Sequence, residues 1–234
     1  MTFTPLTPNP SKQLEIDVRG SSWLRFPIPT HVVTKDDSIE SVVEKYVRPH
    51  VQSGDYVFIS ERVVAITQGR SYRITDIKPS RIAVFLVRFV YKSPYGIGLG
   101  SPWTMELAIR EVGLPRILLA AAVAACTKPF GIRGMFYRVA GRQAAAIDGP
   151  CSYTLPPYNE CATLGPKDPN GVAKRISTLL GVGVVIIDAN DLGVDILGRS
   201  SQDISISWAE QVFQDNPLGQ STEQTPLCIV RKKL

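Results

Sequence analysis

Three aspartates of the sequence stand at the ends of predicted strands, where carboxylates can gather around a ligand. Asp148 lies where an extended run stops at a Gly-Pro turn. Asp188 and Asp191 follow an apolar run, with Asn190 between them. Oxygen ligands of this kind suit Mg²⁺ or Mn²⁺, and phosphate groups can complete the coordination shell. The alternative is that these side chains only cap turns, as Asp and Asn commonly do.

The elements that position the later aspartates have the clearest pattern in the chain. Val184–Ile187 is a β-branched apolar run, which predicts a buried strand. A helix is predicted before it, because Asp168 and Pro169 suit a helix start and Gly181 suits its end. The apolar residues of that helix recur on one face, at Val172, Ile176, Leu179 and Leu180. The predicted strand would therefore end at a turn that contains Asp188 and Asp191.

The remaining sequence mixes the two kinds of element without a regular alternation. Strands are predicted over Gln13–Val18, Tyr56–Ile59, Arg81–Tyr91 and Gly131–Ile147. Helices are predicted to begin at Asp36-Asp37-Ser38 and at Ser101-Pro102. The Ala-rich run Ile117–Cys126 predicts a buried helix, with Cys126 in the core. The fold class predicted from this mixture is α+β.

Composition excludes several classes of protein. The chain has 234 residues, of which 44% are hydrophobic and 20% charged, with a net charge of +5. These values are typical of a globular protein, and the four cysteines form no Cys-x-x-Cys pair. The longest apolar run is half the length of a membrane span, which needs ~20 residues, and no signal peptide is visible. We therefore expect a soluble cytoplasmic protein with no membrane partner, with a flexible tail over residues 1–12 and one domain over 13–234.

Two further features could bind anions, but a structural explanation is favoured for each. The loop Gly96–Gly100 could present backbone amides, but it lacks the Lys-Ser/Thr of a P-loop, so a simple connection is favoured. Cations recur singly between Arg110 and Arg142. A nucleic-acid interface would cluster them among exposed aromatic residues, so ordinary surface charge is favoured and no nucleic-acid partner is expected.

Four stretches occur in an order and spacing that point to one family. The first runs from Pro27-Ile28-Pro29 to Lys35-Asp36-Asp37, and the second from Ser53-Gly54-Asp55 to Gln68-Gly69-Arg70. The third is Ala146-Ile147-Asp148. The fourth runs from Leu164 through the predicted helix to Gly193. Together they resemble the coenzyme F420-0:L-glutamate ligase family, the gamma-glutamyl ligases of deazaflavin coenzyme biosynthesis.

That resemblance implies an α+β body in an intertwined homodimer, for which Leu118–Ala125 would supply a close-packing surface. It implies GTP-dependent amide formation, in which a deazaflavin or folate-like carboxylate becomes an acyl phosphate that the amine of L-glutamate attacks. Asp148, with Asp188 or Asp191, would hold Mg²⁺ or Mn²⁺. The positions expected to bind nucleotide or cofactor precursor are Pro29, Arg62, Gly69 and Arg70.

The sequence departs from the family pattern beside these positions. A lysine that contacts the nucleotide is replaced by Ile66, and the following glutamate is replaced by Gln68. Arg62, one helical turn before Ile66, could restore the positive charge. The alternative function is therefore a non-catalytic ligand-binding protein that retains the ligase fold, since an enzyme must compensate for these two replacements and a binding protein need not.

Overall fold

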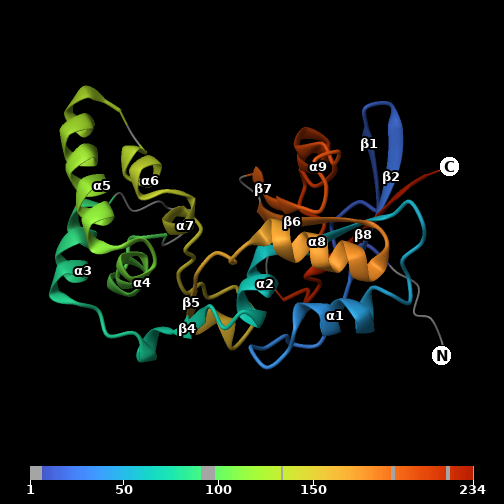
Figure 1. The fold of residues 1–234 in the computed structure, drawn as a ribbon, viewed down its shortest axis with the longest axis horizontal. Helices are drawn as coiled ribbons and strands as arrows, with labels where there is room; N and C mark the ends of the chain where they lie inside the picture. The colour runs from blue at the N-terminus through green and yellow to red at the C-terminus, as the bar shows by residue number, and fades with distance from the viewer. Residues whose placement is uncertain (1–6, 91–97, 133, 191–192, 220–221, 234) are drawn as a thin grey trace. The chain divides into compact units, whose positions relative to one another are not determined.

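The computed structural model describes residues 7–90, 98–132, 134–190, 193–219 and 222–233 (Figure 1). The chain divides into two compact units. The first unit contains residues 1–68 and 166–234, and the second contains residues 69–165, inserted between its two parts. The predictions of a flexible tail over 1–12 and of one domain over 13–234 stay predictions.

The first unit is built on a six-stranded sheet with the order β1-β2-β8-β3-β6-β7. Its strands are β1 (Glu15–Val18), β2 (Ser21–Ile28), β3 (Tyr56–Ser60), β6 (Gly183–Asn190), β7 (Gly193–Arg199) and β8 (Leu227–Lys232). Only the pair β3–β6 is parallel among the described strand pairs of this sheet. The strands predicted over Tyr56–Ile59 and Val184–Ile187 are confirmed, and the structure shows that they are parallel neighbours.

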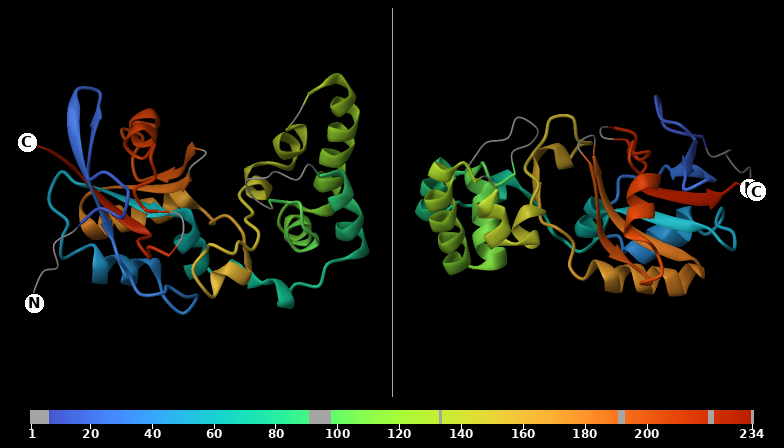
Figure 2. Two further views of the ribbon diagram at one scale, coloured as in Figure 1. Left: turned by 180° about the vertical axis from the view of Figure 1, so that it is seen from behind. Right: turned by 90° about the horizontal axis from the view of Figure 1, so that it is seen from above.

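Helices cover both faces of this sheet, because its strands alternate apolar side chains between two cores. Val57 and Ile59 face one core, which also contains residues of α1 (Ile39–Tyr46), α2 (Glu61–Thr67) and α8 (Pro169–Leu180). Phe58 faces the other core, which α9 (Ile206–Val212) completes. Figure 2 shows α1 and α9 on opposite sides of the sheet.

The helix starts of the first unit agree with the sequence. The Ser38 hydroxyl accepts the Ser41 N–H at the start of α1, and Asp168 accepts the Gly171 N–H at the start of α8. Gly181 ends α8 in the left-handed conformation that glycine adopts without strain. The predictions for these two helices are confirmed. The sequence could predict their ends because a cap involves only residues close together in the chain.

The inserted unit is mainly helical. It contains α3 (Arg81–Leu86), α4 (Pro102–Val112), α5 (Leu114–Thr127), α6 (Met135–Ala140) and α7 (Arg142–Ala145), with 3₁₀ turns between them. A short ribbon pairs β4 (Ser71–Arg73) with β5 (Cys161–Thr163). The predicted start of α4 is confirmed, with Ser101 and Thr104 forming a capping box. An α+β fold class therefore holds for the chain.

Two strand predictions in the inserted unit are wrong. Arg81–Tyr91 was expected to be extended, but Ser80 caps a helix, and Ala83 and Leu86 are buried three residues apart. Gly131–Ile147 was also expected to be extended, yet it forms α6 and α7. Phe136 and Ala140 are buried four positions apart on α6, which is the helical spacing, and Ala144 of α7 is buried after the break at Gly141. Val, Ile and Tyr raised its strand propensity, and tertiary packing overrode it.

The Ala-rich helix is confirmed as α5, but its predicted burial holds only at Ile117 and Ala120. Cys126 is exposed, so its assignment to the core is wrong. None of the described helices is long and apolar enough to cross a membrane. Residues 91–97 lie outside the described part of the chain, so the anion-binding reading of the loop Gly96–Gly100 stays open.

Candidate functional site

Strand register brings three chain segments to one edge of the first unit's sheet. Ile28 of β2 pairs with Leu227, Leu227 pairs with Ile59 of β3, and Ile59 pairs with Ile186 of β6. The strands β2, β3 and β6 run in the same direction, so their carboxyl ends lie along this line. Neighbouring strands are ~4.8 Å apart, so the three ends span roughly 15 Å. Connections at the carboxyl ends of strands commonly carry the functional residues of α/β sheets.

Three of the predicted site residues belong to this carboxyl edge. Pro29 directly follows β2 and is exposed, Arg62 is the second residue of α2 after β3, and Asp188 lies near the end of β6. The sheet register therefore explains how segments about 160 residues apart in sequence contribute to one place. Asp191 lies outside the described residues.

The helix after β3 carries Ile66, the position where the resemblance implies a lysine. Ile66 is only 6% exposed, so its apolar side chain is packed into the core of the first unit. Arg62, one turn earlier on the same helix, is half-buried. A cation at this helix therefore remains at the edge of the sheet, one turn closer to the end of β3.

Two carboxylates face each other at the end of β6. Asp188 pairs in register with Asp195 of β7. Val184 and Ile186 contribute to the core beneath α1, α2 and α8, so alternation places Asp188 on that same face. Directly opposite residues of antiparallel strands have Cβ atoms ~5 Å apart and share a face, so the two negative charges repel each other. Asp195 was not singled out in the sequence, because only the pairing with β7 reveals it.

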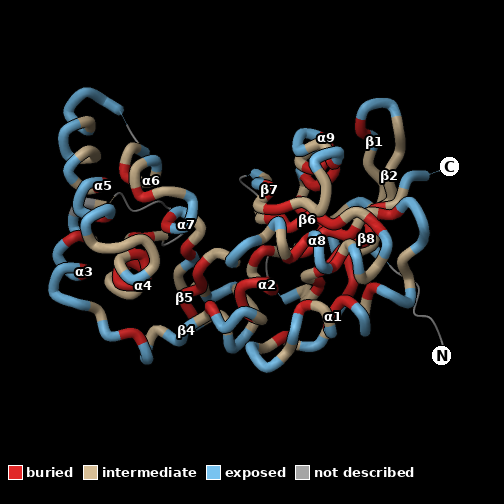
Figure 3. Tube along the Cα trace, viewed as in Figure 1, coloured by how far each residue is buried: buried red, intermediate tan, exposed pale blue. Residues whose placement is uncertain are grey.

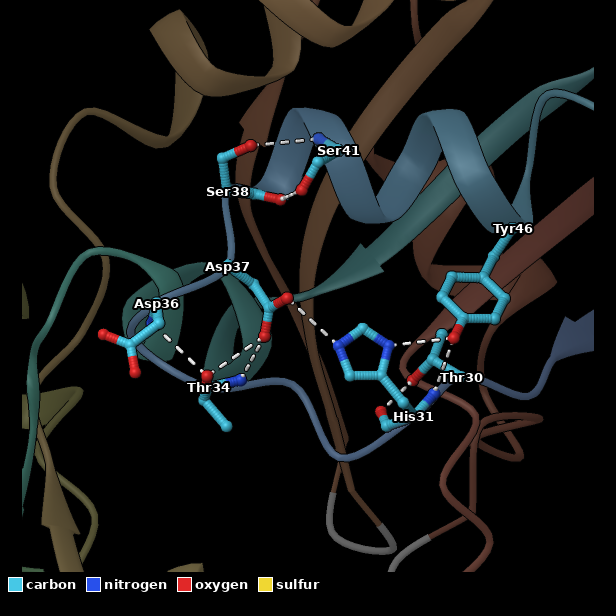
Figure 4. A network of polar contacts seen from close by, with 8 residues as sticks. All are labelled: Thr30, His31, Thr34, Asp36, Asp37, Ser38, Ser41 and Tyr46. Atoms are coloured by element: carbon cyan, nitrogen blue, oxygen red, sulfur yellow. Dashed lines mark hydrogen bonds and ion pairs between the residues drawn. The ribbon is translucent and has the colours of Figure 1, made fainter.

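A hydrogen-bond network fastens the connection between β2 and α1 (Figure 4). The ring of His31 contacts the Tyr46 hydroxyl through Nδ1 at 2.9 Å and the Asp37 carboxylate through Nε2 at 3.1 Å. The second oxygen of Asp37 accepts the Thr34 N–H at 2.8 Å and the Thr34 hydroxyl at 3.1 Å. These bonds hold the chain that follows Pro29 against the start and the end of α1.

Asp37 is the electrostatic centre of this network. The Thr34 N–H that donates to its carboxylate lowers the pKa of Asp37, partial burial opposes this, and His31 lowers it further. Asp37 is therefore ionised at neutral pH and suited to fix the orientation of His31. The sequence shows both residues six positions apart in a proline-bounded connection, but only the structure shows that they meet.

A side-chain amide fixes the segment that leads into α8. Gln68 Nε2 donates to the Lys167 carbonyl at 3.0 Å, and the Lys167 N–H donates to Gln68 Oε1 at 2.7 Å. A carboxylate cannot donate, so a glutamate at this position would keep only one of these bonds. Close packing holds the same helix start, because a Cβ on Gly198 would lie 2.4 Å from the backbone of Pro169.

The remaining predicted residues belong to the inserted unit. Arg70 is buried, and its guanidinium donates to the Gly165 carbonyl and to Glu111, both at 2.7 Å. Gly69 has a φ of +68°, a left-handed conformation that favours glycine. Asp148 is exposed and exchanges backbone hydrogen bonds with Thr163. Roles of Gly69, Arg70 and Asp148 in binding stay predictions.

The described side chains offer an incomplete set of metal ligands. Within the described residues, no group of three His, Cys, Asp or Glu side chains could hold a metal ion. The opposed pair Asp188 and Asp195 offers hard oxygen donors of the kind Mg²⁺ or Mn²⁺ prefers. These two aspartates can therefore contribute to a metal site but do not complete one, and pairing of Asp188 with Asp148 stays a prediction.

Comparison with known families settles the resemblance. The sequence model of F420-0:gamma-glutamyl ligase matches residues 27–212, which is most of the chain. This protein belongs to the F420-0:gamma-glutamyl ligase family. The match covers the last two residues of β2 and the whole of β3, α2 and β6, so Pro29, Arg62 and Asp188 lie within the family domain, whereas β8 lies outside it. No curated protein matches the chain.

Proposed function

We propose that this member of the family is a ligase that joins a cofactor-type carboxylic acid to L-glutamate, at the expense of a nucleoside triphosphate. The observation that carries the proposal is the family match over residues 27–212, which contains Pro29, Arg62 and Asp188 of the carboxyl edge. The acid would be a deazaflavin or a folate-like pterin, as the resemblance implies. GTP would be the phosphoryl donor.

Two steps would form the amide. The substrate carboxylate attacks the γ-phosphoryl group of GTP, which gives an acyl phosphate and releases GDP. The amine of glutamate, after losing a proton, then attacks the acyl carbon, and inorganic phosphate leaves. Phosphoryl transfer needs positioning and charge stabilisation more than covalent help from the protein.

The residues at the carboxyl edge have matching properties. The positive charge of Arg62 would attract the phosphate groups, and the exposed ring of Pro29 would contact an apolar part of the ligand. The aspartate pair at the end of β6 would contribute ligands to Mg²⁺ or Mn²⁺, which offsets negative charge where phosphates meet a carboxylate. The Asp37–His31–Tyr46 network would keep the segment after Pro29 in place.

GTP should bind more weakly here than in a family member that has the lysine. Ile66 supplies no charge, and losing one charge-assisted contact costs roughly 1.5–3 kcal/mol, or about one to two decades in affinity. We therefore expect poor GTP-driven ligation of glutamate to the standard deazaflavin substrate. A folate-like acid or another nucleotide should be tried beside it.

The test is a ligation assay with a substrate panel. The purified protein is incubated with deazaflavin and folate-type acids, L-glutamate, GTP or ATP, and Mn²⁺, and the glutamylated product is detected by mass. Hydroxylamine in place of glutamate traps an acyl phosphate as a hydroxamate. The Arg62→Met variant should lose turnover, whereas Arg175→Met, on the exposed side of α8, should retain it. Ligand binding without any nucleotide turnover would favour the non-catalytic alternative.

We also propose that the protein acts as a homodimer, which the family resemblance implies. Light scattering at micromolar concentration should give twice the mass of the 25.7 kDa chain. A monomer mass under those conditions would contradict this part of the proposal.

A further inference from the structure

The short ribbon of β4 and β5 turns one face to the core of the inserted unit and a polar face away from it. Ala162 and Leu164, on either side of Thr163, are buried in that core. Because side chains alternate along a strand, Thr163 belongs to the other face. It is nevertheless only 5% exposed. Figure 3 shows β5 in the red of buried residues, beside the more open β4.

Backbone pairing sets three oxygen-bearing side chains in a row on the polar face. Ser71 of β4 lies opposite Thr163 in the register of the ribbon. On the other side of Thr163, Asp148 forms an antiparallel bridge with it. Directly opposite residues share a face, with Cβ atoms ~4.5–5.5 Å apart. The row therefore reads Ser71, Thr163, Asp148, with the threonine in the middle.

The positions of the two residues at the bridge are fixed by the backbone. The Asp148 N–H donates to the Thr163 carbonyl, and the Thr163 N–H donates to the Asp148 carbonyl, both at 2.9 Å. The Thr163 hydroxyl is in turn held by Ser71, since their side-chain oxygens are 2.9 Å apart. One hydroxyl proton is shared in that bond, so lone pairs of the Thr163 oxygen remain for a ligand. A fixed oxygen thus lies beside the aspartate.

The row is open to solvent at one end and closed in the middle. Asp148 is exposed, whereas Thr163 is buried. Bonds from Mg²⁺ to oxygen measure ~2.1 Å, so two oxygens on one ion lie roughly 3–4 Å apart. Opposite side chains with Cβ atoms ~5 Å apart can bring their oxygens to this separation. A cation that enters from the side of Asp148 can therefore contact both residues.

We propose that Thr163 is a further ligand of the divalent cation that Asp148 is expected to bind, and that Ser71 positions its hydroxyl. This inference rests on the proposed function, in which the ion accompanies the nucleotide. A carboxylate and a hydroxyl are hard donors, and Mg²⁺ is commonly bound by one or two carboxylates together with substrate phosphates. The hydroxyl adds an oxygen without adding negative charge, so it does not repel those phosphates.

A Mn²⁺ titration of the full chain, with the free ion followed by electron paramagnetic resonance, tests the inference. Loss of a partner that orients a ligand weakens metal binding by about 10–100-fold, so Ser71→Ala should bind Mn²⁺ about tenfold more weakly. Thr163→Val keeps the side-chain shape without the hydroxyl and should weaken binding at least as much. Thr163→Ser should bind like the unmodified protein. The matched control is Thr127→Val, a half-buried threonine of α5 whose hydroxyl donates to the Val123 carbonyl.

The outcomes separate this inference from the proposed function. If Asp148→Asn loses Mn²⁺ binding while Thr163→Val and Ser71→Ala keep it, the inference about Thr163 is wrong and the metal site at Asp148 stands. If Asp148→Asn binds Mn²⁺ unchanged, the metal site itself is wrong, and the inference is overturned with it. A purely structural hydroxyl pair would lower the thermal midpoint of Thr163→Val without Mn²⁺ and leave the affinity unchanged. Should circular dichroism show Thr163→Val to be unfolded, the affinity of Ser71→Ala decides.

Discussion

The side-chain amide of Gln68 makes two hydrogen bonds with the backbone of Lys167: it donates to the carbonyl and accepts from the N–H. Two residues paired in a β-sheet exchange the same two bonds. This contact joins the end of α2 to the segment before α8. It gives Gln68 a physical role of its own, which explains why a glutamine suits the position where the family pattern has a glutamate.

Replacing Gln68 by Glu should destabilise the first unit at neutral pH. The carboxylate can accept the Lys167 N–H, but it turns an oxygen toward the Lys167 carbonyl, at a cost of about 1 kcal/mol. Urea unfolding should therefore show a lower midpoint for Gln68→Glu, and part of the loss should return below pH 4, where a protonated glutamate can donate. Gln143→Glu, at an exposed position of α7, is the matched control. Equal midpoints for both variants would contradict the double hydrogen bond.

Asp37 should contribute stability that depends on pH. Its pKa is lowered in the folded protein, chiefly by the Thr34 N–H, so the stabilisation is present above the pKa of the unfolded chain, about 3.9. It is lost as the pH falls through the lower folded value. Asp37→Asn should thus be less stable than the unmodified protein at pH 7, and the difference should shrink in acid. Asp36→Asn, one residue earlier and exposed, should show no such convergence.

Asp188 and Asp195 should both contribute to the response of the protein to Mn²⁺. Asp195→Asn should reduce the stabilisation by Mn²⁺, because it removes one of two carboxylates that lie opposite each other in the sheet register. Thermal unfolding with Mn²⁺ should stabilise the unmodified protein, while Asp188→Asn and Asp148→Asn remain folded and lose that gain. An unchanged Mn²⁺ response in Asp188→Asn would reject the proposed metal ligand.

Three of the four cysteines should differ in reactivity. Cys126 is exposed, whereas Cys228 is fully buried and burial strongly raises the pKa of its thiol. Burial also raises the pKa of the Cys161 thiol. Because the thiolate is the reactive form, iodoacetamide at neutral pH should modify Cys126 first and reach Cys161 and Cys228 only on unfolding. Modification of Cys228 at the rate of Cys126, read by peptide mass, would contradict the fold of this strand.

Local signals predicted the first unit well and the inserted unit poorly. The caps at Ser38 and Asp168 and the β-branched strand of Val184–Ile187 act over a few residues, so the sequence alone shows them. In the inserted unit, the segment 131–147 has a strand-like composition but forms two short helices that break at Gly141. Phe136, Ala140 and Ala144 of these helices are buried in one core, and a core depends on the tertiary structure.

The sequence by itself determined the family, the fold class and the residue types that could carry chemistry. Only the tertiary structure decided which of them meet, because the pairing of β2, β8, β3 and β6 joins segments far apart in the chain. That pairing places Pro29, Arg62 and Asp188 at one sheet edge and sets Asp195 opposite Asp188. Burial is likewise a tertiary property: α5 is apolar over most of its length, and only the structure shows that Ile117 and Ala120 are its buried residues.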